Sequence, residues 1–363
     1  MARRHTYRAD AASVAGTAVI EEFANLGRDD VASVTASTTP VLRVETVESN
    51  TLSGPITVPM PSTLGDTGIV AHPIALGGST FGWTLGADAA HAVLDRFAGT
   101  GGDLLDTADS YAAGRSETII GSWLRSRHTR DRMRVMTKVG RHPDHQGLAP
   151  VDIRSAVEAS LSRLDTDRID VLFFHGDDPE TPLEESLGAV DALITEGKVL
   201  AIGASDFSPE RLIEARVLAA NGLPRFELLT ARYNLMDRRP FEGATELVAH
   251  AQGLAVLPYF ALANGFLGGQ VRRRSEVRRD ARGERVAHHL GRRGHRVLGA
   301  LDELAFAHGV QPATIALAWL LAKPTVAAPV VSATKPDQVE ALIAAASVEL
   351  HRSELVELDR ASA

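Results

Sequence analysis

Short apolar runs alternate with segments of helical period along most of this chain, from about residue 64 onward. The apolar runs predict eight strands, at residues 73–76, 103–106, 134–138, 171–174, 201–203, 226–230, 255–258 and 328–331. The segments between them predict helices at residues 88–98, 116–126, 151–164, 183–196, 209–220, 243–251 and 336–345. Two further helices, at about 296–307 and 312–321, interrupt this alternation before the last strand.

Eight short strands that alternate with helices form either a closed parallel barrel or an open doubly wound sheet. No Gly-x-Gly-x-x-Gly follows a predicted strand, as a Rossmann unit would require. We therefore predict an α/β fold of the (β/α)8 TIM-barrel class. Ahead of the barrel, LGDTGIVAHPIALG predicts a hairpin around Thr67-Gly68 that caps the base.

The first 61 residues follow a different pattern. They are rich in Ala, Ser, Thr and Val, with one candidate helix around residues 15–26 and a weakly alternating VLRVETVE stretch. We predict an N-terminal extension over residues 1–61, flexible or loosely attached, followed by one barrel domain over residues 62–363.

Composition narrows the class of protein. The 363-residue chain has a net charge of -8, 44% hydrophobic residues and 23% charged residues, values typical of a globular protein. The acidic balance argues against bulk binding to nucleic acid or anionic membranes. Because cysteine is absent, there is no disulfide, thiol nucleophile or cysteine metal site. No apolar run approaches about 18 residues and no secretion signal is evident, so we expect a cytoplasmic protein with no membrane span and no metal.

An arginine-rich stretch stands out against this acidic background. Residues 272–296 contain ten arginines and three acidic residues. A solvated loop after the seventh strand is the simplest interpretation. Base-specific nucleic-acid binding would need an aromatic or sheet context that the stretch lacks.

Four polar residues stand at or just after the ends of predicted strands. They are Asp106 and Tyr111 in LLDTADSYAAGRSE, Lys138 in RVMTKVG and His175 in VLFFHGDD. Active sites of (β/α)8 barrels lie at the carboxyl ends of the strands. A tyrosine, with a pKa of about 10, is a poor acid at neutral pH unless a cation stabilises its phenolate. Lys138 would supply that cation, Asp106 would fix it, and His175 would donate a hydrogen bond to a substrate oxygen. The four residues predict the reduction of a carbonyl group by hydride from a separate cofactor.

Residues 62–350 resemble the aldo-keto reductase family. The resemblance rests on nine ordered segments: LGGSTFGW (76–83), Asp106 to Tyr111 with Gly114-x-Ser116-Glu117, Thr137-Lys138, Asp170-x4-His175, IGASDF (202–207), YNLMDR (233–238), PYFALANGFLGG (258–269), ALAWLL (316–321) and SATKPDQVE (332–340). It implies a (β/α)8 barrel that binds NADP(H) without a Rossmann domain. It also implies that Tyr111 is the general acid for reduction and the base for oxidation, that Lys138, held by Asp106, lowers its pKa, and that His175 orients the carbonyl oxygen.

The same resemblance implies a set of cofactor-binding residues. Tyr259 would stack on the nicotinamide, and Ser205 would hydrogen-bond its carboxamide. Ser79 and Thr80 would lie near the nicotinamide ribose. The pyrophosphate path would be lined by Leu262, Asn264 and Gly265, and the adenosine 2′-phosphate would lie near Ser332, Thr334, Lys335 and Gln338. An arginine of the 272–296 stretch would belong to a flap over the pyrophosphate.

Three departures from the family pattern concern this cofactor site. Asp206 stands where the family usually has Asn, and Thr230 stands where it usually has Gln. An ionised Asp accepts from the carboxamide but cannot donate, and Thr is the shorter side chain. At the adenine end, Ser332, Gln338 and Leu342 replace commoner residues, which leaves Lys335 as the one cation for the 2′-phosphate.

We therefore predict an NADP-dependent aldo-keto reductase, an oxidoreductase that reduces an aldehyde or ketone to an alcohol. Two alternatives stay open: a cofactor-binding regulatory subunit of the same fold, or a reductase acting on a nucleotide-linked sugar or an activated double bond. A glutamate in place of His175 would favour double-bond reduction, so the histidine favours carbonyl chemistry. Phe81, Trp83 and Phe174 suggest a partly aromatic pocket. The expected partner is a small-molecule carbonyl substrate; the substrate itself and the oligomeric state are not determined by the sequence.

Overall fold

The computed structural model describes residues 62–279 and 281–363. The predicted extension over residues 1–61, with its candidate helix and strand, lies outside the described residues. Eight strands form one parallel sheet: β3 (Ala75–Gly77), β4 (Leu104–Asp106), β5 (Arg134–Val139), β8 (Ile169–Phe174), β9 (Val199–Ser205), β10 (Phe226–Arg232), β11 (Ala255–Tyr259) and β12 (Val330–Val331). Their spatial order is β11-β10-β9-β8-β5-β4-β3-β12.

The two edges of this sheet meet and close a barrel. The Val256 amide of β11 donates to the Thr325 carbonyl at 2.9 Å, and the Ala327 amide donates back to the Val256 carbonyl at 2.9 Å. Residues 325–327 lead directly into β12, so these two hydrogen bonds connect the first and last strands of the sheet. The closed barrel predicted from the alternating pattern is confirmed, and the open doubly wound sheet is excluded.

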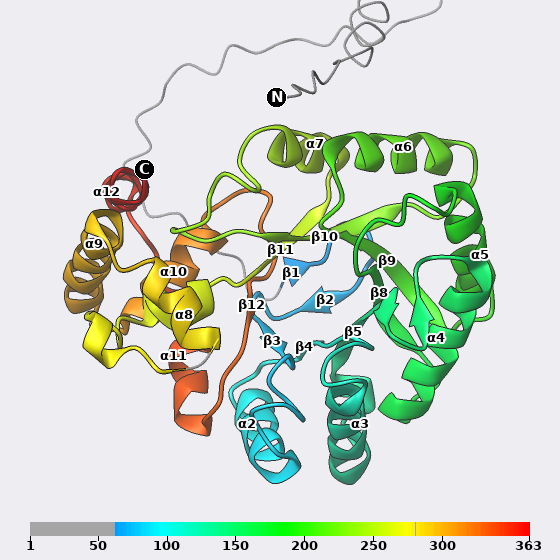
Figure 1. Ribbon diagram of the computed structural model, residues 1–363, viewed down its shortest axis with the longest axis horizontal. Coiled ribbons are helices and arrows are strands. Elements are labelled where there is room, and N and C mark those ends of the chain that lie inside the picture. Colours follow the sequence, from blue (N-terminus) through cyan, green and yellow to red (C-terminus); the bar gives the residue numbers. More distant parts are fainter. Residues whose placement is uncertain (1–61, 280) are drawn as a thin grey trace, which may run out of the picture. The chain divides into compact units, whose positions relative to one another are not determined.

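Helices surround the strands as an outer ring (Figure 1). The first six are α2 (Ala87–Gly99), α3 (Arg115–Arg127), α4 (Pro150–Leu164), α5 (Leu183–Thr195), α6 (Pro209–Ala220) and α7 (Ala244–Gln252). Each of their ends lies within one residue of the predicted position, as for 88–98 against Ala87–Gly99. Local signals set these ends: Pro150 and Pro209 occupy the first turns of α4 and α6, and Ser208 caps α6 by accepting from the Arg211 amide.

The carboxyl-terminal third differs more from the prediction. Its helices are α8 (Ala281–His288), α9 (Arg292–His308), α10 (Pro312–Leu321), α11 (Val339–Ile343) and α12 (Arg352–Ser362). The two predicted extra helices are α9 and α10, but α9 begins earlier than expected, and α8 and α12 were not predicted.

The helix predicted at 336–345 is present, but its hydrogen-bond pattern changes along its length. The segment divides into a 3-10 turn η4 (Pro336–Gln338), the short α11 and a second turn η5 (Ala344–Ser347). The hydroxyl of Thr314 in α10 donates to the Ala341 carbonyl at 2.7 Å, so the end of α11 is capped from a neighbouring helix. This tertiary contact could not be read from the local pattern.

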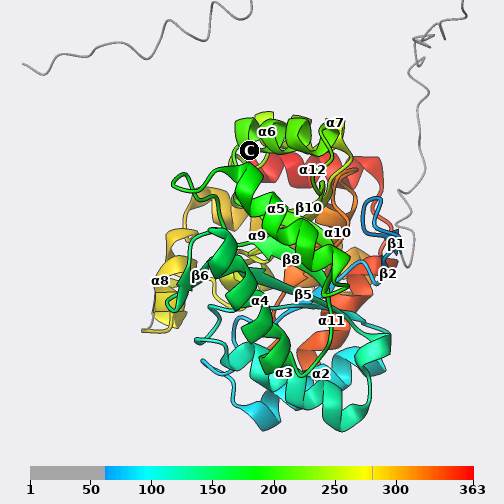
Figure 2. The same ribbon diagram turned by 90° about the vertical axis from the view of Figure 1, so that its right-hand side faces the viewer.

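A hairpin closes one end of the barrel, as predicted. Its strands are β1 (Ser62–Thr63) and β2 (Val70–Ala71), and the Leu64 amide donates to the Ile69 carbonyl at 2.9 Å. Leu64 is fully buried in the barrel interior beside residues of β3, β4, β5 and β8. A second hairpin, β6 (Arg141–His142) with β7 (His145–Gln146), was not predicted and lies at the opposite end (Figure 2).

Two apolar layers fill the fold. Side chains that point into the barrel, among them Leu104, Met136 and Phe173, form one buried cluster. Side chains that point outward from the strands form a larger cluster with the helices. Within the described residues no single helix is long and apolar enough to span a membrane; α9 and α10 reach that length and apolarity only as a pair bent by 95°.

Candidate active site

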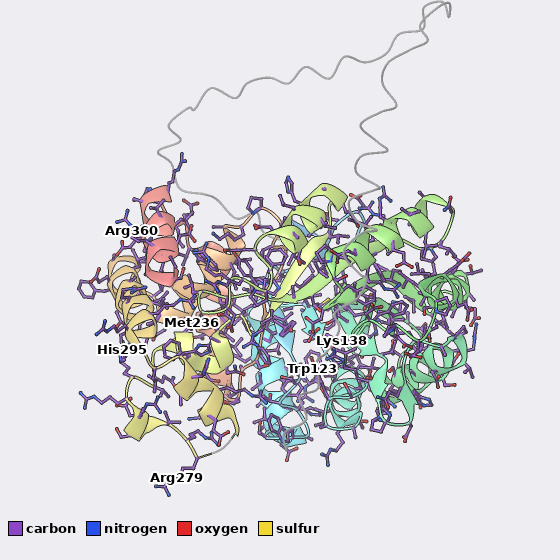
Figure 3. The ribbon with its side chains drawn as sticks, turned by 45° about the horizontal axis from the view of Figure 1, so that its top comes forward. Trp123, Lys138, Met236, Arg279, His295 and Arg360 are labelled. Atoms are coloured by element: carbon purple, nitrogen blue, oxygen red, sulfur yellow. The ribbon has the colours of Figure 1, made fainter. Side chains whose placement is uncertain are left out.

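The period-two geometry of the strands places three of the four predicted catalytic residues inside one end of the barrel. Leu104, Met136 and Phe173 point into the interior. Side chains two residues apart in a strand lie on the same face. Asp106, Lys138 and His175 each follow one of these residues by two positions, with His175 just beyond the end of β8. Parallel register holds β4, β5 and β8 side by side. Figure 3 shows Lys138 near the centre of the barrel.

Lys138 is the centre of this group. Its side chain is almost fully buried and forms an ion pair with the Asp106 carboxylate. The ammonium also donates to the Thr107 carbonyl at 3.0 Å and to the Tyr111 hydroxyl at 3.5 Å. Burial lowers the pKa of Lys138, but the charges of Asp106 and Tyr111 outweigh it, so the net pKa is raised and the ammonium stays charged.

Tyr111 and His175 face each other at the same place. Their rings meet edge to face, with centroids 5.8 Å apart and an interplanar angle of 78°. Ser110 Oγ lies 3.3 Å from His175 Nδ1, and the His175 amide donates to the Val139 carbonyl at 2.9 Å. The structure therefore brings together Asp106, Tyr111, Lys138 and His175, as the sequence predicted.

The two ring residues carry shifted pKa values. Burial, together with the charges of Lys138 and Arg141, lowers the pKa of His175 to about 2, so its imidazole is neutral across the physiological range. Burial raises the pKa of Tyr111, and Lys138 opposes that rise. Lys138 thus changes the pKa of Tyr111 in the expected direction, but the effect of burial on that pKa is larger. Tyr111 is a protonated group with a proton to donate.

The loop that carries Tyr111 is held in an unusual backbone conformation. Ala112 and Ala113 have φ of 52° and 55°, and Gly114 has φ of 81°. Left-handed φ at two alanines is strained, so surrounding contacts must fix it. The Ser116 hydroxyl donates to the Gly78 carbonyl at 2.8 Å and lies 2.8 Å from Thr107 Oγ1.

A buried acidic pair behind Tyr111 was not assigned a role from the sequence. Glu117 accepts from the Thr137 hydroxyl at 2.6 Å and from Arg163 Nε at 2.7 Å. Asp109 is fully buried; among the described residues no group meets strict hydrogen-bond geometry with its carboxylate oxygens, although the backbone amides of Ser110 and Gly140 lie close enough to oppose the rise of its pKa. Burial and the nearby Glu117 raise the pKa of Asp109 to about 7. The sequence signal that could have pointed to Asp109 is its position two residues before Tyr111, in DTADSY.

The candidate nicotinamide residues lie at the carboxyl ends of β9, β10 and β11. Ser205 and Thr230 are paired in register and buried. Thr230 Oγ1, like Thr80 Oγ1 after β3, is a buried hydroxyl without a partner among the described residues. The Tyr259 hydroxyl donates to Asp206 Oδ1 at 2.9 Å. Unpaired buried hydroxyls suit a ligand that carries an amide and ribose hydroxyls.

The segment after β11 forms a turn that suits close approach of a ligand. Leu262 precedes the 3-10 turn η2 (Ala263–Gly268), in which Asn264 and Gly265 have φ of 59° and 96°. The Gly265 amide donates to the Leu262 carbonyl at 2.8 Å. The turn packs against α8 and α10.

Ser79, predicted near the nicotinamide ribose, and Ser332, predicted at the adenine end, lie side by side after β3 and β12. Their hydroxyls are 3.4 Å apart, and Ser332 donates to the Gly77 carbonyl at 2.8 Å. Gln338 is occupied as a cap: its side-chain oxygen accepts from the amides of Thr334 at 2.8 Å and Lys335 at 3.2 Å. Lys335 is exposed.

The arginine-rich stretch is not a solvated loop. It includes the turn η3 (Arg274–Glu276), α8 and the start of α9. Arg272 forms a bidentate pair with Asp302 of α9 at 2.6 and 2.7 Å, and Arg293 donates to the carbonyls of Ser362 and Leu235. In Figure 3, Arg279 and His295 lie at the outer edge of the protein, away from Lys138.

Only one of the three predicted pocket aromatics is available to a ligand. Phe81 and Phe174 are about 1% exposed, and the Phe174 ring packs edge to face on Phe226 at 5.7 Å. Trp83, in the loop after β3, is 65% exposed. Phe81 and Phe174 therefore belong to the core.

Comparison with known proteins agrees with this arrangement. The aldo/keto reductase family profile matches residues 73–363. The norsolorinic acid reductase stcV of Emericella nidulans is 34% identical over 80% of this chain and 78% of the relative. The aldo-keto reductase ausK of Aspergillus calidoustus is 32% identical over 85% and 84%, and the oxidoreductase YrpG of Bacillus subtilis is 30% identical over 80% and 91%.

Barrel and site together define an oxidoreductase of the carbonyl-reducing type. The chain belongs to the aldo/keto reductase family.

Proposed function

We propose that this protein reduces an aldehyde or ketone to an alcohol with NADP(H), and that Tyr111 is the general acid. The observation that carries the proposal is the contact of one buried ammonium, Lys138 Nζ, with both the Asp106 carboxylate and the Tyr111 hydroxyl. A charged group beside the hydroxyl stabilises the tyrosinate left after proton donation. Across the site, the neutral His175 ring can donate a hydrogen bond to the same substrate oxygen.

A nicotinamide cofactor, when bound, supplies the hydride. In the proposal Tyr259 holds the ring, and Ser205, Asp206 and Thr230 take the carboxamide. The unpaired hydroxyls of Thr230 and Thr80 support this assignment, because a buried hydroxyl gains from a polar ligand atom. Asp206 accepts from the carboxamide NH2 without donating, so Thr230 is left as a donor.

The remaining cofactor residues follow the path of the dinucleotide. Ser79 and Thr80 bind the nicotinamide ribose. The pyrophosphate is bound by Leu262, Asn264 and Gly265, and the adenosine end by Ser332, Thr334, Lys335 and Gln338. The proposed preference for NADP over NAD depends on Lys335, the one cation in the segment from Ser332 to Glu340. Because Gln338 caps its own loop, we propose that the preference is modest.

The proposed substrate is a small aromatic carbonyl compound. Several relatives are called norsolorinic acid reductases, and one of Pestalotiopsis microspora is called an aryl-alcohol dehydrogenase. The exposed Trp83 beside buried Thr80 offers an aromatic surface near the site. A cytoplasmic location belongs to the same proposal, supported by the cysteine-free sequence.

The test is a panel of aromatic aldehydes and ketones with NADPH, followed by absorbance at the nicotinamide band. Wild type should turn over part of the panel, and Tyr111→Phe should lower the turnover by roughly two to four orders of magnitude. NADPH affinity, measured by fluorescence titration, should change little in this variant. Equal turnover of wild type and Tyr111→Phe, with chemistry rate-limiting, would remove the tyrosine from the mechanism.

A further inference from the structure

Arg141 lies beside the catalytic group without a role in it. It begins β6, two residues after β5 ends, and follows Gly140, whose φ is 107°. Its guanidinium packs on the backbone immediately beyond His175: a Cβ at Gly176 would lie 2.8 Å from Arg141 Nη2 and 3.3 Å from Nε. A glycine at position 176 therefore makes room for the guanidinium beside the catalytic histidine.

The charge of Arg141 reaches both ring residues of the site. Burial raises the pKa of Tyr111 and lowers that of His175, and the positive charge of Arg141 lowers both. Lys138 is buried and committed to Asp106 and Tyr111. Arg141, with its side chain 52% exposed, is the cation that solvent and ligands can reach.

The acidic groups nearby are largely satisfied by other partners. Asp177 pairs with Arg211 at 2.8 Å, and Asp178 accepts from the Leu148 amide at 2.7 Å. Asp206 Oδ2 lies 3.9 Å from Arg141 Nη2, while its other oxygen accepts from Tyr259. In the described part of the chain Arg141 makes no closer ion pair and donates no hydrogen bond. A long, partly exposed pair of this kind is weak, so the donors of Arg141 remain available.

We propose that Arg141 binds an anionic oxygen of the substrate, a carboxylate or a phenolate carried on the same molecule as the carbonyl group that is reduced. A guanidinium presents a planar fork of donors that matches a carboxylate and is always charged. The inference rests on the proposed function, because it places the second substrate group relative to Tyr111 and His175. It goes beyond that function by making the substrates acidic aromatic carbonyl compounds.

The experiment compares matched acid and neutral substrates. The carboxylate arm uses 2-, 3- and 4-carboxybenzaldehyde, each against its methyl ester; the phenolate arm uses 4-hydroxybenzaldehyde against 4-methoxybenzaldehyde above the pKa of the phenol. The proteins are wild type, Arg141→Met, Arg141→Lys and the control Arg154→Met. Arg154 lies on α4, where it pairs with Glu196, and its side chain is 44% exposed.

For at least one carboxylate isomer, Arg141→Met should raise the ratio of the acid KM to the ester KM by roughly 10- to 100-fold. Arg141→Lys should recover part of that change, and Arg154→Met should leave the ratio at the wild-type value. A larger ratio in the phenolate arm than in the carboxylate arm would identify phenolates as the preferred class.

Two results would overturn the inference. An unchanged acid-to-ester ratio in Arg141→Met, for every pair, would show that Arg141 does not contact the anion. An equal fall in kcat for acid and ester would mean that Arg141 acts on the carbonyl oxygen instead. If no aldehyde is turned over by any of the proteins, the proposed function fails. The role of Arg141 is then tested by calorimetric titration of each acid and ester, with and without NADP. Anion binding by Arg141 is supported only if the acid binds more tightly than its ester and Arg141→Met removes the difference; otherwise it is refuted.

Discussion

The ammonium nitrogen of Lys138 lies 3.5 Å from the hydroxyl oxygen of Tyr111 and 5.1 Å from the centroid of its ring. The same nitrogen is fixed from the other side by Asp106 and by the Thr107 carbonyl. A buried cation held in this way cannot move to another partner when the tyrosine gives up its proton. The charge of Lys138, on β5, therefore affects the pKa of Tyr111, in the loop after β4.

Replacing Lys138 by methionine tests this link. Without the ammonium, only the smaller effect of the Arg141 charge opposes the burial that raises the pKa of Tyr111, and each unit of further rise corresponds to about 1.4 kcal/mol. We expect carbonyl reduction to fall by roughly two orders of magnitude or more. Alcohol oxidation, which needs the tyrosinate, should move to higher pH in the residual activity. A pH profile identical to wild type would show that Lys138 does not set the acidity of Tyr111.

His175 should act as a neutral donor throughout the working pH range. Its pKa of about 2 means that no imidazolium forms between about pH 5 and pH 8. We therefore expect the pH dependence of kcat/KM to lack an inflection due to this residue, and its NMR ring signals not to titrate. His175→Gln, which keeps a neutral donor, should retain more activity than His175→Ala. Titration of the His175 signals near pH 6.5 would contradict this prediction.

Asp109 should make stability depend on pH in an unusual direction. Its folded pKa of about 7 lies above the ordinary value of 3.8, so the folded state holds this proton more tightly than the unfolded state. The stabilisation is complete below pH 3.8 and is lost as pH rises through 7. At about 1.4 kcal/mol per unit, the upper limit is about 4 kcal/mol.

Asp109→Asn removes that ionisation. Its Tm should exceed that of wild type at pH 8, and the difference should shrink toward pH 5. Asp191→Asn, at an exposed site on α5, is the matched control and should show no such trend. If Asp109→Asn is equally or less stable than wild type at pH 8, the amides of Ser110 and Gly140 and the charge of Arg163 stabilise the Asp109 carboxylate enough to outweigh its burial.

Lys335 should contribute to the choice of cofactor. It is exposed and precedes the 3-10 turn η4. One charge-assisted contact with the 2′-phosphate is worth about 1.5–3 kcal/mol, with exposure favouring the low end. Lys335→Ala should therefore weaken NADPH binding by about tenfold and leave NADH nearly unchanged, in titrations at one salt concentration. Equal losses for both cofactors would make Lys335 a structural residue.

Residues 1–61 should be dispensable for cofactor binding, because the family match begins at residue 73. Deleting them should leave NADPH fluorescence titration nearly unaltered. Extending the deletion to residue 72 removes the base hairpin and the fully buried Leu64, whose loss alone should cost about 2–5 kcal/mol. A tenfold weaker NADPH affinity after the shorter deletion would show that the extension contributes to the site.

The sequence determined the order of the elements and the four residues that the structure gathers at one end of the barrel. Helices with local signals begin at or within one residue of the predicted position, as α6 does at Pro209 after the Ser208 cap. Asp106, Lys138 and His175 could be placed because strand alternation and parallel register are regular, so residues far apart in the chain reach one end of the barrel by the same rule.

Only the tertiary structure determined the contacts between segments that are far apart in the sequence. The Thr314 hydroxyl donates to a carbonyl of α11, a contact between two helices that the local pattern does not contain. Phe174 had the pattern of a pocket residue, but Phe226 covers its ring. Arg141 was assigned no role from the sequence, and its packing on Gly176 places it beside His175. Periodicity fixes which face of an element a side chain occupies, whereas its partner, its burial and its pKa depend on neighbours that only the folded chain brings together.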